Sequence, residues 1–327
     1  MRSAWLATAA LLGAASLAGA DTYTWRLPRG FPAPAVPADN PMSEAKVALG
    51  ERLFFEPQLS VTGRHSCASC HDPARAFTDG RARAVGATGQ VLRHNAMPLA
   101  NAAYNVSFGW SRPDIRSLEE QMLEPLTNEH PIELGLAGRE SGVVAALGAD
   151  ARYRNAFAAA FPDESAAVTF ANVVKAIAAF ERTLVSGDSA FDRLAFGGEH
   201  DALSAEARRG MSLFFSPSVG CSGCHSGFNF AGNWVDSQGA TGETSFADNG
   251  TGLRLRVPSL RNVAVTAPYM HDGRIASLAA VLEHYSGRPN ATPLSEDDRH
   301  ALVAFLESLT DPRFLARYSL KSTPDGT

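Results

Sequence analysis

Cys67-Ala68-Ser69-Cys70-His71 decides the fold of this chain, and Cys221-Ser222-Gly223-Cys224-His225 repeats its pattern in the second half. In a C-x-x-C-H run, the two thiols form thioethers with the vinyl groups of a haem, and the adjacent histidine ligates the iron. The chain contains only these four cysteines. The sequence therefore predicts two c-type haems, one attached at each run, with His71 and His225 as axial ligands.

Other uses of paired cysteines fit the two runs less well. Disulfides, redox-active C-x-x-C motifs and zinc sites all employ the same residue type. A redox motif does not require a histidine immediately afterwards, and a zinc site would have to recruit two halves that lie far apart in sequence. The histidine that follows both pairs favours haem attachment.

Residues 1–20 have the pattern of a secretory signal peptide. Arg2 supplies a positive charge, an apolar run extends from Ala4 to Leu17, and the small residues Ala18-Gly19-Ala20 precede Asp21. The alternative is a membrane anchor, but this run is too short to span a bilayer comfortably, and no other stretch is long enough. We expect a soluble periplasmic protein with no membrane span, a location that suits covalent haem attachment.

The rest of the chain is long enough for two domains. The net charge of -5 and the isoelectric point near 6.0 give no basic surface for nucleic acid. We therefore expect no nucleic-acid partner.

A sequence repeat precedes the two haem motifs. The run from Gly50 to Pro57, Gly-Glu-Arg-Leu-Phe-Phe-Glu-Pro, shares five identities at fixed spacing with the run from Gly210 to Pro217, Gly-Met-Ser-Leu-Phe-Phe-Ser-Pro. Each run leads into a C-x-x-C-H motif, which indicates two related haem domains. We predict a mostly α-helical protein made of two tandem cytochrome c-like domains, with long loops and little or no strand. The domains span residues 21–196 and 197–327, divided near Gly197-Gly198.

Helix signals recur along the chain. Ser43 begins a helix that carries Leu49 and Phe54, and Ser117-Leu118-Glu119-Glu120 has the form of a capping box. The other expected elements are a helix within Ala166 to Val185, a long loop from Phe228 to Gly252, a helix from Ser277 through Tyr285 and a final helix from Ser295 through Leu309.

Two haems with one histidine each leave two axial positions open, and these positions decide between electron transfer and peroxide chemistry. By residue type alone, spacing cannot choose among the candidates, which are Met270, Tyr285, His65, His94, His130, His200, His271, His284 and His300. Most of them must be ordinary surface or core residues.

Further motifs resemble the bacterial dihaem cytochrome c peroxidase and MauG superfamily over almost the whole mature chain. They are Leu53-Phe54-Phe55, Ser66 to His71, Ala76 to Gly80, Asn101 to Asn105, Leu118 to Gln121, Pro258 to Val263 and Ala267 to Arg274. Within that superfamily, Trp25 to Phe31, Val36 to Met42, Val85 to Gly89 and Asn95-Ala96-Met97 look most like the MbnH family, whose partner protein is MbnP.

The resemblance implies a sixth ligand for the second haem, fourteen residues after the histidine of the A-P-Y-x-H segment. That position is methionine in ordinary peroxidases and tyrosine in the MauG-like branch. Here it is Tyr285, so the resemblance implies that Met270, which precedes His271, is not the ligand. The helical pattern agrees, because Leu278, Leu282 and Tyr285 share a face. Without the resemblance, such a tyrosine would be read as core packing. A coordinated phenolate would favour highly oxidised iron.

The first haem would then be the peroxide site, with an open face lined as the family lines it. Gln121, Pro125 and Glu133 match the family's glutamine, proline and P-x-E-x-G glutamate, and Glu133 would move a proton between the oxygens of peroxide. The spacing from Gln121 to Glu133 exceeds the commonest family pattern by two residues, so Glu124 and Glu129 stay open as alternatives.

Two further features follow from the resemblance. Trp110 matches, one residue out of register, the family tryptophan that lies between the haems. An indole there could carry an oxidising equivalent. The alternative is a buried tryptophan that only packs in the apolar core. Asn95 and the carbonyls of Thr266 and Pro268 match a calcium site whose oxygen ligands suit that ion. The resemblance also implies that ordinary peroxidases place a displaceable histidine on the first haem. His94 lies near that region but inside the Arg93-His94-Asn95 motif, so we expect the first haem to be open already in its diferric form.

These implications lead to one functional hypothesis. Hydrogen peroxide would bring the pair of haems to a two-electron-oxidised, bis-ferryl-type state, which then oxidises a periplasmic protein substrate. The MbnH likeness implies conversion of a tryptophan on an MbnP-like partner towards kynurenine. The first alternative is a cytochrome c peroxidase that uses a small electron-donor protein. The second is a dihaem electron carrier, which Glu133 disfavours.

Overall fold

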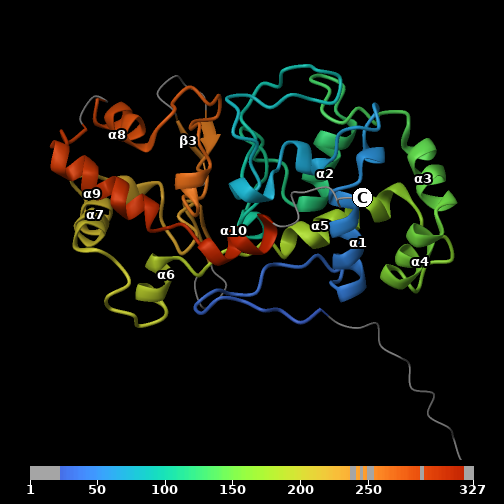
Figure 1. The fold of residues 1–327 in the computed structure, drawn as a ribbon, viewed down its shortest axis with the longest axis horizontal. Coiled ribbons are helices and arrows are strands. Elements are labelled where there is room, and N and C mark those ends of the chain that lie inside the picture. The colour runs from blue at the N-terminus through green and yellow to red at the C-terminus, as the bar shows by residue number, and fades with distance from the viewer. Residues whose placement is uncertain (1–22, 236–240, 244–245, 249–253, 288–290, 320–327) are drawn as a thin grey trace, which may run out of the picture.

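The computed structural model describes residues 23–235, 241–243, 246–248, 254–287 and 291–319, and it is mostly helical (Figure 1). The α-helices are α1 Glu44–Phe54, α2 Leu118–Thr127, α3 Glu140–Ala149, α4 Ala151–Ala160, α5 Phe170–Arg182, α6 Ala190–Ala195, α7 Ala205–Phe215, α8 Leu278–Ser286, α9 Glu296–Glu307 and α10 Pro312–Ser319. The expected signal peptide lies outside the described residues. Within those residues, no helix has the length and apolar character needed to cross a membrane.

The repeat seen in sequence has a counterpart in two helix crossings. In the first half, α1 packs on α5 so closely that a Cβ atom at Gly50 would overlap the carbonyl oxygen of Ala176. In the second half, α7 packs on α9, and a Cβ atom at Gly210 would overlap the carbonyl oxygen of Ala301. Glycine is needed at both crossings because only a residue without a side chain lets the backbones approach so closely.

Side-chain caps set where several helices begin, as the sequence predicts. Ser43, Ser117, Ser277 and Ser295 are the N-caps of α1, α2, α8 and α9, and each side chain accepts a hydrogen bond from a backbone N–H of the first turn. The capping box at Ser117 is only half formed, because the Glu120 carboxylate accepts from the N–H of Arg116. The helix from Ser295 is not the final one, since α10 follows it.

Two apolar cores correspond to the two haem motifs. The first is built around α1 and α5 and includes Phe54, Phe77 and Phe180. The second is built around α7 and α9 and includes Phe214, Phe230 and Phe305. Figure 1 shows them side by side, with α7, α8 and α9 on the left and α1 to α5 on the right.

Each half sends one short helix to the core of the other. Phe191 of α6 packs against Phe230, with ring centroids 5.1 Å apart, although α6 follows the helices of the first half. Phe314 of α10 packs against Phe77 at 6.0 Å, although α10 is the last helix of the chain. The division at 196/197 remains a prediction. The packing shows that a helix from each side of this division contributes a phenylalanine to the core on the other side.

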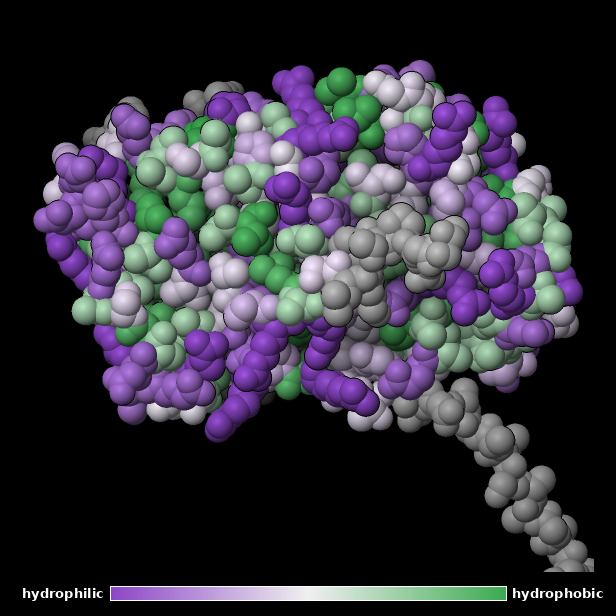
Figure 2. Space-filling model, viewed as in Figure 1, coloured by the Kyte–Doolittle hydropathy of each residue, from purple (hydrophilic) through white to green (hydrophobic). Residues whose placement is uncertain are grey.

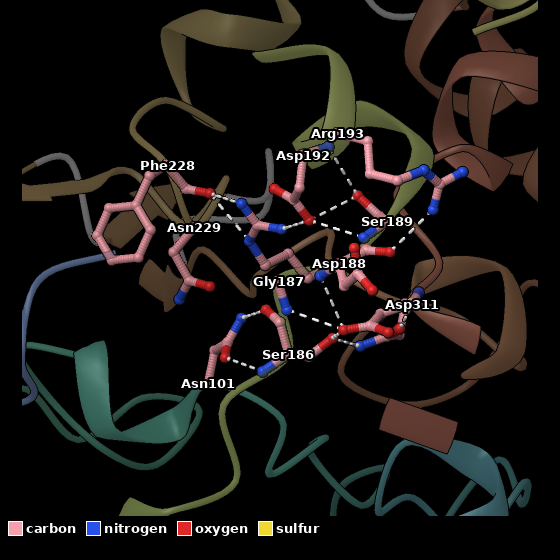
Figure 3. Close-up of polar contacts among 12 residues, drawn as sticks. Asn101, Ser186, Gly187, Asp188, Ser189, Asp192, Arg193, Phe228, Asn229 and Asp311 are labelled. Atoms are coloured by element: carbon pink, nitrogen blue, oxygen red, sulfur yellow. Dashed lines mark hydrogen bonds and ion pairs between the residues drawn. The ribbon is translucent and has the colours of Figure 1, made fainter. Parts of the chain in front are cut away.

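A buried polar network fastens the halves together (Figure 3). Asn101 and Asn262 both have left-handed backbone, with φ of 61° and 59°, and each begins a short 3-10 helix. The Asn101 amide exchanges two hydrogen bonds with the backbone of Ser186. The Asn262 oxygen accepts from the N–H of Asp311, whose carboxylate accepts from the N–H groups of Gly187 and Asp188. All of these partners are buried or nearly so, which makes the junction rigid.

The segment expected to be one long loop contains short hairpins. β1 Asn233–Val235 pairs antiparallel with β2 Thr241–Glu243, and β3 Phe246–Asp248 pairs with β4 Arg254–Arg256. Three-residue strands give too little alternation to be recognised in sequence. β4 matters below because it delivers Arg256 to the first half.

Candidate functional site

The two predicted axial histidines are held in the same way. His71 follows the 3-10 turn Cys67–Ser69, and its Nδ1 lies 2.8 Å from the backbone carbonyl oxygen of Phe77. His225 follows the turn Cys221–Gly223, and its Nδ1 lies 3.0 Å from the carbonyl oxygen of Phe230. A carbonyl acceptor fixes the proton on Nδ1 and leaves the Nε2 lone pair available to a metal.

The phenylalanines that provide these carbonyls share an unusual backbone. Phe77 and Phe230 have φ of 64° and 50°, a left-handed conformation that is uncommon for a bulky residue. Both side chains are fully buried, so core packing holds the conformation in place. The structure therefore stores local backbone strain where it orients each axial histidine.

Burial also sets the protonation of the haem-attachment residues. Desolvation lowers the pKa of His71 and of His225, which keeps both imidazoles neutral and able to ligate. Burial raises the pKa of Cys67, and it raises the pKa of Cys70 to about 11. None of the four cysteines is joined to another in a disulfide.

A cavity of about 540 Å³ opens beside the first motif. It gathers most of the residues that sequence reasoning assigned to the peroxide site, from positions spread over the first half of the chain. The predicted residues in its wall are Cys67, Cys70, His71, Asn95, Trp110, Gln121, Pro125 and Glu133.

Backbone hydrogen bonds fix the turn that carries Glu133. The N–H of Leu134 donates to the carbonyl of Pro125 at 2.9 Å, which ties the turn to α2, the helix that carries Gln121. The N–H of Ala87 donates to the Glu133 carbonyl at 2.7 Å. The loop from 85 to 89 crosses so closely that a Cβ at Gly86 would overlap the Ile132 carbonyl oxygen.

The electrostatics of the cavity favour Glu133 over its alternatives as the proton carrier. Desolvation, assisted by the nearby Glu124, raises the pKa of Glu133 to about 7, from an ordinary value of 4.5. Glu124 also lines the cavity, but its carboxylate lies 3.3 Å from Arg112 in an ion pair. Glu129 is exposed and is not part of the cavity wall. A carboxyl that titrates near neutral pH is suited to general acid and base catalysis.

Trp110 lies at the junction of the halves. Its indole Nε1 donates to the carbonyl of Asn95 at 2.9 Å, and its ring centroid lies 6.4 Å from that of His94 and 6.5 Å from that of His271. The N–H of Asn95 donates to the carbonyl of His271 at 2.8 Å, so the first half meets the segment that contains Thr266 and Pro268. The Asn95 amide nitrogen donates to the Arg81 carbonyl.

Sequence reasoning missed Arg256, which provides a test of whether the cavity suits a haem. Arg256 is buried in the cavity wall, its Nε has no hydrogen-bond partner, and desolvation lowers its pKa to about 10. A buried guanidinium without a counter-ion is costly, so an anion is expected beside it. The propionates of a haem held by Cys67, Cys70 and His71 would supply that charge, so the residues fit the group. The only sequence signal was its place two residues before Pro258.

Glu181 of α5 is a second residue that sequence reasoning missed. It lines the same cavity, its Oε2 is buried without a hydrogen-bond partner, and desolvation raises its pKa to about 8. The equivalent position on α9, one residue after Phe305, is Leu306. Only the first half carries a buried acid at this point.

Tyr285 lies near the end of α8, a helix that contacts α9. Leu278 and Leu282 on the same helix are buried, whereas 42% of Tyr285 is exposed. The side chain is thus not a core residue, which was the alternative explanation of its position. Its role as a ligand of the second haem remains a prediction.

Among the described residues, no group of three or more histidine, cysteine, aspartate or glutamate side chains converges as a metal-binding cluster. The two C-x-x-C pairs therefore do not meet to form a shared zinc site.

Known proteins resemble this chain over most of its length. The family model described as di-haem cytochrome c peroxidase matches residues 44–200. The methylamine utilization protein MauG of Methylorubrum extorquens is 38% identical, with 87% of this chain and 83% of that protein covered. Cytochrome c551 peroxidase of Pseudomonas aeruginosa is 32% identical, with 86% and 83% covered.

A solved structure resembles the whole fold. The crystal structure of a MauG-like protein associated with microbial copper homeostasis superposes with a TM-score of 0.84 at 36% identity, covering 90% of this chain and 97% of that one. Together, these relatives indicate a haem-dependent oxidoreductase with two haem cofactors.

Proposed function

Because the chain belongs to the di-haem cytochrome c peroxidase and MauG family, we propose that it uses hydrogen peroxide to oxidise a tryptophan of a second protein towards kynurenine. One observation carries the proposal. The same chain contains a cavity lined by Glu133, whose pKa lies near neutrality, and a tyrosine at position 285.

The first cavity binds peroxide and moves its protons. The haem held by Cys67, Cys70 and His71 would supply electrons that cleave peroxide and would later recover electrons from the protein substrate. Gln121 holds peroxide by hydrogen bonding. Glu133 accepts the proton of the inner oxygen and returns it to the outer oxygen, which leaves as water. Its pKa of about 7 permits both transfers near neutral pH.

Trp110 links the two halves in this proposal. Its place beside His94 and His271 supports a role in sharing oxidising equivalents between the haem sites. The indole N–H donates to a backbone carbonyl, which is not a base, so the proton stays on the ring when an electron leaves.

Ligation by Tyr285 would let the second haem store oxidising equivalents rather than relay electrons to the first haem. A phenolate is anionic and a strong donor, and it would lower the tendency of this haem to accept electrons from a small donor protein. We include Asn95, Thr266 and Pro268 in the proposal as ligands of a calcium ion between the halves, since oxygen ligands suit that ion.

The substrate we propose is a periplasmic protein that resembles MbnP. The likeness to a protein associated with microbial copper homeostasis supports this choice over other protein substrates, and residues 1–20 support export. Conversion of tryptophan to N-formylkynurenine inserts two oxygen atoms and removes four electrons, so it consumes two molecules of peroxide. Hydrolysis then releases formate and leaves kynurenine.

The direct test incubates the diferric enzyme with peroxide and an MbnP-like protein, then locates oxidised residues by mass spectrometry. We expect kynurenine at a single tryptophan, at two peroxides per residue. A partner that stays unmodified would sink this version of the function.

The relatives named as cytochrome c peroxidases support a second function, the reduction of peroxide with a small electron-donor protein. It predicts rapid turnover with a reduced cytochrome or cupredoxin, and no modified tryptophan. Tyrosine rather than methionine at position 285 counts against it.

A further inference from the structure

A second cavity, of about 380 Å³, opens between residues 26–29, α6 and α10. We call it the arginine cavity, because its wall contains Arg26, Arg29, Arg193, Arg313 and Arg317. A cluster of five arginines is unexpected in a chain whose net charge is -5. Figure 2 shows hydrophilic side chains gathered over this part of the molecule, at the lower middle of the view.

Two of the arginines already have carboxylate partners. Arg313 lies 2.9 Å from Asp188, and Arg193 lies 3.4 Å from Glu199. The remaining acids of the wall are Asp192 and Asp311. Both are buried, and the network of Figure 3 engages them.

The other three arginines are available to a ligand. Arg26, Arg29 and Arg317 are exposed, and among the described residues none has a carboxylate within ion-pair distance. Three guanidinium groups around one hollow can each bind a carboxylate through two parallel hydrogen bonds. The cavity therefore offers guanidinium groups that an acidic partner can bind.

The floor of the arginine cavity is connected to the first axial histidine. Phe314 of α10 lines the cavity and packs against Phe77, and the Phe77 carbonyl accepts the hydrogen bond of His71. The amphipathic helix α10 thus presents Arg313 and Arg317 to the cavity and Phe314 to the core of the first half.

The opposite wall is connected to the second axial histidine. Asp192, Arg193 and Phe196 of the α6 segment line the cavity, and Phe191 of the same helix packs against Phe230. The Phe230 carbonyl lies against His225. A molecule seated in the cavity therefore touches the two elements that support both axial histidines.

We propose that the arginine cavity is the docking site for an acidic segment of the protein substrate, whose carboxylates pair with Arg26, Arg29 and Arg317. This inference rests on the proposed function, because it takes the substrate to be a protein. The arginines of the cavity favour an acidic segment. Because the cavity lies between α6 and α10, a partner bound there contacts elements that pack against both haem-binding cores.

The test uses the dihaem holoprotein and two peptides. One peptide repeats glutamate and glycine around a single tryptophan, and the other has glutamine in place of glutamate. Binding is measured by fluorescence anisotropy without peroxide. We expect the glutamate peptide to bind more tightly than the glutamine peptide by roughly tenfold at low salt, and the preference to vanish at about 0.5 M salt.

Matched variants locate the site. The triple variant R26A/R29A/R317A is expected to lose roughly tenfold in affinity for the glutamate peptide. The control R64A/R139A/R152A removes the same charge from exposed positions outside the cavity and is expected to bind like the unmodified protein. Haem absorbance checks that both variants are assembled.

Three outcomes would overturn the docking site. They are equal binding of the two peptides, equal losses in the two triple variants, and binding of phosphatidylglycerol vesicles in preference to the glutamate peptide. Addition of peroxide to the bound peptide then tests the proposed function separately. A bound tryptophan that stays unoxidised would contradict that function, whereas the docking site is judged by the binding measurements alone.

Discussion

The two halves of the molecule hold their predicted axial histidines alike but differ in the residues that we predict for the open side of each haem site. Both use a glycine at a close helix crossing, a left-handed phenylalanine whose carbonyl meets the histidine, and a buried asparagine that begins a 3-10 helix. In the first half, α2 and the turn at Glu133 add Gln121 and Glu133 to the wall of a cavity. In the second, α8 brings the exposed Tyr285.

The comparison teaches that the duplicated scaffold does not specify the chemistry. Helix crossings and backbone hydrogen bonds hold the two predicted iron ligands in the same way, and we propose that the differing residues on α2, on α8 and in the turn at Glu133 decide whether peroxide reacts there. Substitutions at positions that the two halves share should therefore act similarly on both, whereas substitutions at positions where the halves differ should act on one.

The largest effect is expected from Glu133→Gln in the first cavity. Loss of the proton carrier should slow the reaction with peroxide by about 10²–10⁴-fold, the usual contribution of a general acid-base group. Stopped-flow absorbance of the diferric protein measures the rate. Glu129→Gln is the matched control and should leave the rate unchanged; if it slowed the reaction instead, Glu129 would replace Glu133 in this role.

Gly50→Ala and Gly210→Ala test the equivalence of the two crossings. Each new methyl group meets a backbone carbonyl oxygen of the facing helix, so each should destabilise the protein by about 3 kcal/mol. Gly142→Ala is the control, because nothing lies near a Cβ there and alanine favours the helix. Thermal unfolding gives the comparison, and a large loss at only one crossing would break the equivalence.

Tyr285→Met should make the second half resemble that of an ordinary peroxidase. Replacing a phenolate by a thioether should raise the reduction potential of that haem by about 0.1 V or more, within the roughly 0.8 V that axial ligands span. Spectroelectrochemistry measures the potential of each haem. Tyr285→Phe separates ligation from packing, and an unchanged potential in both variants would rule out Tyr285 as a ligand.

The pH dependence of the peroxide reaction should report Glu133. The group acts as a base in its ionised form, and burial raises its pKa to about 7. Below that pH the rate should therefore fall by about tenfold per unit, and above it the rate should level off. Glu133→Gln should flatten the profile. A profile that keeps its shape in the variant would assign the titration to another group.

A pH-dependent effect on stability is expected at Glu181, where the first half has an acid and the second has Leu306. The folded pKa of about 8 lies above the ordinary 4.5, so the folded state binds more protons between these values. Stability should consequently decrease as pH rises through this window, by up to about 1.4 kcal/mol per unit. Glu181→Gln should remove the decrease in denaturant titrations; a decrease that persists would point to a different acid.

Local sequence signals predicted part of the framework, but not α3, α4, α6, α7 or α10. Serine caps marked the starts of α1, α2, α8 and α9, and the repeated Gly-x-x-Leu-Phe-Phe run indicated two related halves, although not the helix crossings that its glycines permit. These features depend on neighbouring residues, so a single sequence records them. The cavity residues from Cys67 to Glu133 came from motif spacing together with the family resemblance.

What the sequence did not reveal depends on contacts between distant segments. Arg256 reaches the first cavity from β4, and Phe314 reaches the first core from the last helix. No periodicity marks a residue that packs against the other half. The short hairpins were also missed, because three residues cannot show an alternating pattern.

The central claim is that the diferric protein reacts with peroxide without prior reduction and keeps the oxidising equivalents. An optical and near-infrared titration with one equivalent of hydrogen peroxide tests it most directly. We predict a rapid, long-lived change equivalent to two electrons. Inertness until one haem has been reduced would contradict the account and would identify an ordinary dihaem peroxidase.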